Sequence, residues 1–149
     1  MTGRSRLRWV CSSLREMEPS LPRRILVIED DRAIRELLVE LLRDEGYETR
    51  SAGNGAEGLD QIEWPPDLIL LDVMMPVMDG PTFRARQLEL QAPLNEIPVI
   101  LLTARRYGSP QIAAMHVNAT VLKPFEDTSL LAVVESILTG VQVAGHGAA

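Results

Sequence analysis

From Arg24 onward, short apolar runs alternate with longer stretches in which apolar and polar residues are mixed. Three runs are apolar at every position and rich in branched side chains: residues 25–28, 68–71 and 99–102. Continuous apolar runs of this length are typical of strands that are covered on both faces. A shorter run at residues 120–122 predicts another strand. Residues 47–52 alternate weakly and carry Glu48 and Arg50, which indicates a solvated edge strand.

The mixed stretches predict helices. After the first run, apolar side chains repeat at the spacing of one helix face, at Ile34, Leu37, Leu38, Leu41 and Leu42. Gly46 then supplies a stop signal. Four more helices are expected, around residues 56–62, 82–90, 110–117 and 128–138. We interpret Asp31 and Asp127 as helix N-caps or turn formers, because a short acceptor side chain can satisfy a free N–H of the first turn.

Five strands that alternate with five helices predict an α/β fold with a parallel sheet, right-handed crossovers and helices on both faces. We assign this domain to residues 24–139. Residues 1–23 are expected to be a basic, disordered extension, and residues 140–149 a flexible tail. The chain shows no internal repeat.

Composition and charge exclude several classes of function. The net charge is −6, and residues 1–24 hold six Arg and two Glu, so the other 9 basic and 19 acidic residues make the body strongly acidic. An acidic body argues against a nucleic-acid partner, since that affinity comes mainly from neutralising phosphates. The longest apolar run, residues 130–134, is far shorter than the roughly 20 residues of a membrane span. A single Cys and two His argue against disulfides and thiolate or histidine metal sites, and favour the cytoplasm.

Polar side chains follow the predicted strands at their carboxyl ends. They are Glu29, Asp30 and Asp31 after the first run, Asp72 after the second, Thr103 after the third and Lys123 after the last. The carboxyl ends of parallel strands lie along one edge of the sheet, where open α/β folds place their ligand sites. We therefore expect these separated residues to meet in one crevice.

The chemistry of these residues points to phosphoryl transfer. Carboxylates on neighbouring strand ends repel one another unless a cation neutralises them, and a set of oxygen ligands favours Mg²⁺, with Mn²⁺ as an alternative ion. An Asp carboxylate can attack phosphorus to form an aspartyl phosphate. The Lys123 ammonium would pair with the added charge, and the Thr103 hydroxyl would donate to it. Each residue alone has a plainer explanation as a turn or strand residue, so the prediction rests on the joint arrangement.

At these residues the chain resembles the receiver domain of two-component response regulators. The motifs that carry the resemblance, in the order of that family, are ILVIEDD at 25–31, LILLDVMMPVMDG at 68–80, VILLTA at 99–104 and LKPF at 122–125. The resemblance covers about residues 24–138. It implies a flavodoxin-like, doubly wound sheet with strand order 2-1-3-4-5.

The resemblance also implies a phosphoacceptor and a metal site. Asp72 would accept the phosphoryl group. Asp30 and Asp72 would contact Mg²⁺ directly, and Glu29 would act mainly through water. The backbone carbonyl of Met74 would be the remaining protein ligand.

A second group of residues would bind the phosphoryl group. The Thr103 hydroxyl would move toward it, assisted by the backbone N–H of Ala104. Lys123 would pair with its charge, and the bond to Pro124 is expected to be cis. The donor would be a phosphohistidine on a sensor histidine kinase or a histidine phosphotransfer protein, and the output a downstream protein target, with no nucleic acid or membrane involved.

Two departures from the family pattern concern transmission of the signal. An aromatic residue usually stands three positions before the lysine, and this chain has Thr120 there. The stretch from Thr103 to Lys123 is about two residues shorter than usual in the family. Within it, His116 and Val117 replace the Gly-Ala that typically stands before the last strand. We therefore expect a short or irregular fourth helix. Tyr107 would pack beside the loop rather than replace the aromatic residue.

Three functions are compared on this basis. The first is a stand-alone receiver that switches protein–protein interactions. The second is a Mg²⁺-dependent phosphatase with an aspartyl-phosphate intermediate, which usually needs a second acid where this chain has the apolar Met74. The third is a binding module that kept the fold but lost phosphorylation. The presence of the full set of residues argues against it, namely Glu29, Asp30, Asp72, Thr103 and Lys123. We expect the receiver, and no turnover of small substrates.

Overall fold

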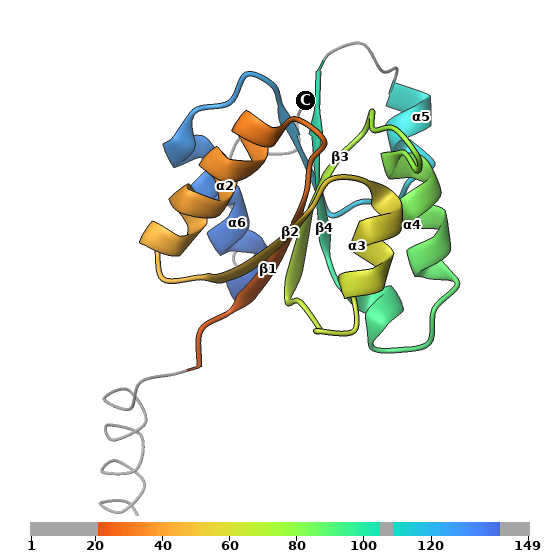
Figure 1. The fold of residues 1–149 in the computed structure, drawn as a ribbon, viewed down its shortest axis with the longest axis horizontal. Helices are drawn as coiled ribbons and strands as arrows, with labels where there is room; N and C mark the ends of the chain where they lie inside the picture. Colours follow the sequence, from red (N-terminus) through yellow and green to blue (C-terminus); the bar gives the residue numbers. More distant parts are fainter. Residues whose placement is uncertain (1–20, 105–108, 141–149) are drawn as a thin grey trace, which may run out of the picture.

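The computed structural model describes residues 21–104 and 109–140 (Figure 1). The predicted extension therefore lies outside the described residues up to position 20, and the predicted tail lies outside them from position 141. The expectation for Tyr107 also falls outside the described residues.

Five parallel strands form one sheet in the order β2-β1-β3-β4-β5, as predicted. The strands are β1 (Arg24–Ile28), β2 (Glu48–Ala52), β3 (Leu68–Asp72), β4 (Val99–Thr103) and β5 (Ala119–Leu122). The order reverses direction at β1, so the crevice expected at the carboxyl ends of the strands opens beside β1 and β3.

Helices cover both faces of the sheet (Figure 1). They are α2 (Arg32–Asp44), α3 (Gly55–Gln61), α4 (Gly80–Leu88), α5 (Ser109–Ala113) and α6 (Asp127–Thr139), with a 3₁₀ helix η1 (Leu94–Glu96) before β4. In Figure 1, α2 and α6 lie on one face, and α3, α4 and α5 on the other. The described residues thus confirm the prediction of five strands and five α-helices.

Two hydrophobic cores form because successive side chains of a strand point to opposite faces of the sheet. On β1, Ile25 and Val27 pack with residues of α2 and α6. Leu26 and Ile28 pack in the second core, which includes Phe83 of α4. This double burial explains why the central strands are apolar at every position.

Local signals set the ends of α2 as predicted. The Asp31 side chain caps the helix by accepting a hydrogen bond from the Ile34 N–H, 3.0 Å away. After the helix, Gly46 has a φ of 92°, and the N–H groups of Gly46 and Tyr47 bond to the Arg43 and Leu42 carbonyls. This is a Schellman ending, which places a glycine at the left-handed position.

Three expectations need correction. Asp127 is not an N-cap: it is the first residue of α6, and the N-cap is Glu126, whose side chain makes no capping hydrogen bond. The α4 helix begins at Gly80 rather than near Thr82, because Asp79 caps it by accepting the Thr82 N–H at 2.9 Å. The α5 helix ends at Ala113 rather than at residue 117, which agrees with the expectation that it would be short.

A search of the described helices found none that combines the length and the apolar character needed to cross a bilayer.

Candidate phosphoryl-accepting site

An open cavity of about 470 Å³ lies at the carboxyl ends of the strands, at the β1–β3 edge. All the predicted site residues except Pro124 line it, namely Glu29, Asp30, Asp72, Met74, Thr103, Ala104 and Lys123. These residues come from four segments that are far apart in the sequence, so the parallel sheet alone brings them together.

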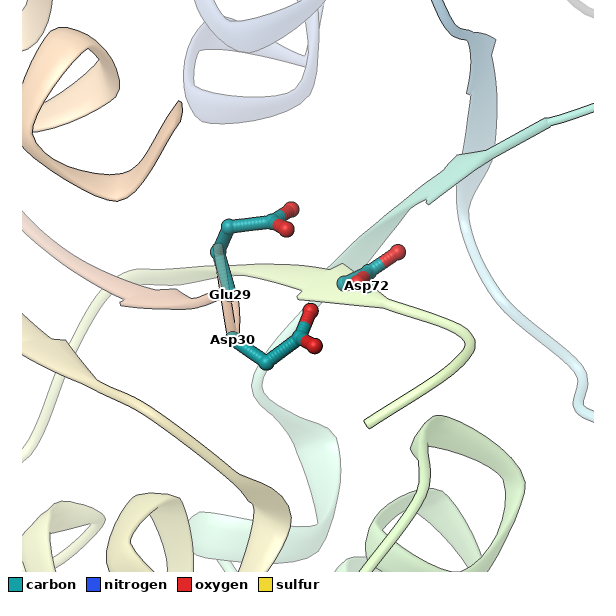
Figure 2. Close-up of side chains that lie close together, drawn as sticks. All are labelled: Glu29, Asp30 and Asp72. Atoms are coloured by element: carbon teal, nitrogen blue, oxygen red, sulfur yellow. The ribbon is translucent and has the colours of Figure 1, made fainter. Parts of the chain in front are cut away.

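Three carboxylates lie around one small region at the end of β1 and β3 (Figure 2). Glu29, Asp30 and Asp72 each offer an oxygen atom, and these oxygens lie within 4.8 Å of one another. Glu29 is 1% exposed and Asp72 is 7% exposed, whereas Asp30 lies at the surface. The cluster is therefore open to solvent on the side of Asp30.

Lys123 bridges the two buried acids. Its Nζ lies 2.8 Å from Glu29 Oε2 and 3.1 Å from Asp72 Oδ1. The backbone N–H of Lys123 donates to the Thr103 carbonyl at 2.8 Å, so β4 holds the lysine at this edge. The bond from Lys123 to Pro124 is cis, as expected.

Burial changes the ionisation of this cluster. It raises the pKa of the Glu29 carboxyl from 4.5 to about 7, opposed by the hydrogen bond from Lys123 and supported by the charge of Asp72. Burial also raises the pKa of the Asp72 carboxyl, against the charge of Lys123. Burial by itself would lower the pKa of the Lys123 ammonium, but its hydrogen bonds and charge interactions with Glu29 and Asp72 raise it overall. One ammonium does not balance the acids, so the cluster is short of positive charge.

These residues fit a magnesium ion. The donor set consists of oxygens alone, which is the set that Mg²⁺ prefers. Burial raises the pKa of both buried acids, and a cation bound among the three clustered carboxylates would favour their charged forms. Asp30 and Asp72, with Glu29 beside them, are the residues that would hold it.

Thr103 and Ala104 lie at the end of β4. The Thr103 side chain is 1% exposed, and its hydroxyl donates to the Ala104 carbonyl at 2.8 Å. This hydrogen bond would have to break before the hydroxyl could donate to a group on Asp72. Thr120, at the position where an aromatic residue was expected, is half-buried on β5.

The backbone after Asp72 is tightly packed. Asp72 Oδ1 accepts a hydrogen bond from the Val73 N–H at 2.9 Å, and the Gly80 N–H donates to the Val73 carbonyl at 2.8 Å. A Cβ at Gly80 would collide with the Asp72 carbonyl oxygen and lie 3.0 Å from the Val73 Cα. Only glycine allows the start of α4 to approach Asp72 this closely.

The sequence analysis did not identify two arginines that bind backbone carbonyls of other segments, Arg35 next to the acidic pair and Arg84 on α4. Arg35 of α2 donates to the carbonyls of Glu29 and Asp30. Arg84 of α4 is buried and donates to the carbonyls of Met115 and His116. The spacing of the buried residues of α4 could have indicated Arg84, since it follows Phe83 on the inward stripe; no local signal marks Arg35.

Comparison with known proteins agrees with this geometry. Residues 25–135 match the family described as "Response regulator receiver domain". The response regulator MprA of Mycobacterium sp. (strain KMS) is 40% identical over 121 residues, which are 79% of this chain and 51% of that protein. The chain thus spans about half the length of the curated relatives it matches.

Solved structures show the same fold. The signal receiver domain of a signal transduction histidine kinase from Syntrophus aciditrophicus is 33% identical, with a TM-score of 0.72 over 80% of this chain and 92% of that chain. The chemotaxis response regulator CheY4 of Vibrio cholerae is 28% identical, with a TM-score of 0.72 over 78% of this chain and 99% of that chain. The family is that of receivers in two-component signalling rather than of turnover enzymes. On the sequence match, the sheet order and the acidic cluster, this chain belongs to the response regulator receiver domain family.

Proposed function

We propose that this receiver accepts a phosphoryl group on Asp72 from a phosphohistidine, in a reaction that requires Mg²⁺, and thereby switches a protein–protein interaction in a phosphorelay. The observation that carries the proposal is the meeting of Asp72, two further acids and one ammonium in a single open cavity. The donor is a sensor histidine kinase or a histidine phosphotransfer protein, and the reaction takes place in the cytoplasm.

The chemistry follows from the positions of the side chains. A carboxylate oxygen of Asp72 attacks the phosphorus, the new P–O bond forms, and the P–N bond to the donor imidazole breaks. The leaving imidazole takes up a proton. Asp30 and Asp72 would hold Mg²⁺, which when bound would supply charge neutralisation for the phosphoryl oxygens. Lys123, already within hydrogen-bond distance of Asp72, pairs with the charge added there.

The Met74 carbonyl, the Ala104 N–H and the Thr103 hydroxyl complete the proposed site. All three residues line the cavity. Thr103 exchanges its bond to the Ala104 carbonyl for one to the phosphoryl group, which frees that carbonyl. Through this local change, the added charge of about −1.5 to −2 biases the α5–β5–α6 face.

Labelling with acetyl phosphate and Mg²⁺ tests the acceptor. The wild-type protein should gain one phosphoryl group, measured by intact mass, and Asp72→Asn or Asp72→Ala should not. Asp60→Asn, which changes an exposed acid on α3, is the matched control and should label as the wild type does. Persistent labelling of Asp72→Ala would place the acceptor elsewhere and contradict the proposal.

Beryllofluoride with Mg²⁺, which mimics the phosphoryl group, tests the switch. Amide resonances of residues 115–135 should shift on titration of the wild-type protein. Lys123→Ala should still accept phosphate from acetyl phosphate but lose most of these shifts, because the ammonium that pairs with the new charge is missing. If the amide resonances of residues 115–135 did not shift in the wild-type protein, switching through this face would be disproved.

A further inference from the structure

Arg35 on α2 binds the backbone that carries the acidic pair. One of its terminal nitrogens, Nη1, lies 2.8 Å from the Glu29 carbonyl oxygen and 3.3 Å from the Asp30 carbonyl oxygen. Both bonds run from the first half of α2 back to the loop before it. A single guanidinium nitrogen thus holds two consecutive peptide groups of the loop between β1 and α2.

The acidic pair needs such a restraint. Glu29 is buried against Lys123, but Asp30 is exposed, so packing does not fix its direction. The direction of the Asp30 side chain therefore depends on the backbone at that residue. The three carboxylates also repel one another, and this repulsion favours movement of the exposed one away from the cluster.

Other bonds hold the ends of the loop. At one end, the Glu29 N–H donates to the Ala52 carbonyl at 3.1 Å. At the other, Asp31 caps α2, and its own N–H donates to Glu29 Oε1 at 3.3 Å. The Arg35 bonds act between these two points, on the two peptide carbonyls that flank the Cα of Asp30.

Arg35 also adds positive charge to this edge of the site. Among the ion pairs that the described residues form, none involves Arg35, whereas Arg32 on the same helix pairs with Glu36. Its partners are the negative ends of two carbonyl dipoles, so its charge is not cancelled by a neighbouring carboxylate at contact distance.

We propose that Arg35 is a positioning residue for Mg²⁺ binding: by holding the Glu29 and Asp30 carbonyls, it keeps the Asp30 carboxylate directed toward Asp72. The proposal rests on the metal-dependent function proposed above. It predicts that removing the contact weakens Mg²⁺ binding even where the folded structure is intact. Outer residues that orient metal ligands commonly change affinity by 10- to 100-fold when they are lost.

The test compares three variants of the full chain. Each is titrated with Mg²⁺, and the amide NMR shifts of residues 29–31 report how much metal is bound. Arg35→Met removes both contact and charge and should raise the Kd for Mg²⁺ about tenfold. Arg35→Lys keeps the charge on a shorter side chain and should recover only part of that loss. Arg32→Met is the matched control: it removes the same charge from an exposed arginine on the same helix, and should leave Kd within about twofold of wild type.

A second readout needs no metal. In EDTA, Arg35→Met should speed hydrogen exchange of the Asp31 amide, while thermal unfolding confirms that the variant is folded. Unchanged Mg²⁺ affinity in Arg35→Met, equal losses in Arg35→Met and Arg32→Met, or wild-type affinity in Arg35→Lys would overturn the assignment. If the wild-type protein bound no Mg²⁺, both the proposed function and this inference would fail. If the wild-type protein bound Mg²⁺ but the Arg35 variants did not show the expected changes in Kd, only this inference would fail.

Discussion

Glu29 lies in an environment that differs strongly from that of a free acid. It is buried, faces Asp72 and bonds to Lys123, and its pKa rises from 4.5 to about 7. The native protein therefore keeps a proton on this cluster at pH values where the unfolded chain has already released it. Stability falls with rising pH wherever the native state binds more protons than the unfolded state.

We expect this to appear as a pH-dependent difference between wild type and Glu29→Gln in EDTA. Between pH 4.5 and about 7, the free energy of unfolding of wild type should fall relative to that of the variant, by an amount on the order of 3 kcal/mol. Above pH 7 the difference should level off, since the Lys123 pKa is raised and lies outside this window. Urea unfolding at several pH values measures the difference, and parallel curves for the two proteins would contradict the expectation.

Gly80 allows the first residue of α4 to pack closely against the backbone of Asp72, the proposed acceptor. Gly80→Ala should destabilise the protein by about 1–3 kcal/mol, because the new methyl group must displace the backbone of Asp72 and Val73. This loss runs against helix propensity, which favours alanine. Acetyl phosphate labelling should fall too, since the displaced backbone carries the acceptor.

Gly53→Ala is the control for Gly80→Ala. A Cβ at Gly53 would meet only side-chain atoms of Glu57 and Arg35, at 3.4 and 3.5 Å, which are ordinary contact distances. Its stability should stay within about 0.5 kcal/mol of wild type. Equal losses in the two variants would show that the approach at Gly80 is not special.

At the scale of elements, α4 stands out because its inward stripe contains polar residues. Its buried residues are Gly80, Phe83, Arg84 and Gln87. Arg84 donates to the Met115 carbonyl at 3.0 Å, to the His116 carbonyl at 2.6 Å and to Gln87 Oε1 at 2.7 Å. Gln87 in turn donates to the Leu94 and Ile97 carbonyls. The helix is thus tied to the segments that precede β4 and β5.

The bonds from Arg84 support an unusual turn. His116 has a φ of 51°, in the left-handed region that rarely holds a residue with a side chain. Its carbonyl and that of Met115 lie just after α5, where a positive charge satisfies free carbonyl groups at the end of a helix. Arg84 therefore holds the turn that follows α5 from a neighbouring helix.

Arg84→Met should destabilise the protein by about 2–4 kcal/mol, because three acceptors, two of them buried, lose their donor. Hydrogen exchange at residues 113–118 should accelerate more than elsewhere. Arg86→Met removes an exposed arginine from the same helix and should change stability by less than about 0.5 kcal/mol. Denaturant unfolding and amide exchange measure both effects. If amide protection fell evenly over the whole fold, the result would contradict a local role of Arg84 at residues 113–118.

For the whole molecule, the acidic cluster links metal binding to stability. A ligand that binds only the folded state raises the free energy of unfolding, by about 2.7 kcal/mol at a concentration 100-fold above its Kd. We expect Mg²⁺ to do so at pH 8, above the pKa of Glu29, and to do less at pH 6, where protons compete for Glu29.

Asp30→Asn should remove most of this stabilisation by Mg²⁺, and the exposed Asp60→Asn should not. Thermal unfolding with and without EDTA measures the effect. Equal stabilisation of wild type and Asp30→Asn would place the ion away from the cluster.

The prediction from sequence succeeded where burial leaves a regular pattern. The unbroken runs of β1, β3 and β4 reflect two covered faces, and they indicated a parallel sheet and the positions of Glu29, Asp72 and Thr103 at its edge. Asp31 and Gly46 were recognised as helix ends because their geometry depends on neighbours within a few residues. Asp127 failed as a cap because the backbone, and not the residue type, decides where a helix begins.

By itself, the sequence determined the elements, their parallel arrangement and the polar residues at the strand ends, because these follow from periodicity and from chain connectivity. Only the tertiary structure decided which of these groups touch, namely that Lys123 bridges Glu29 and Asp72 and that Arg35 and Arg84 bind carbonyls of other segments. Such contacts depend on distances between segments up to 94 residues apart, and a polar side chain carries no local mark of the partner it will meet.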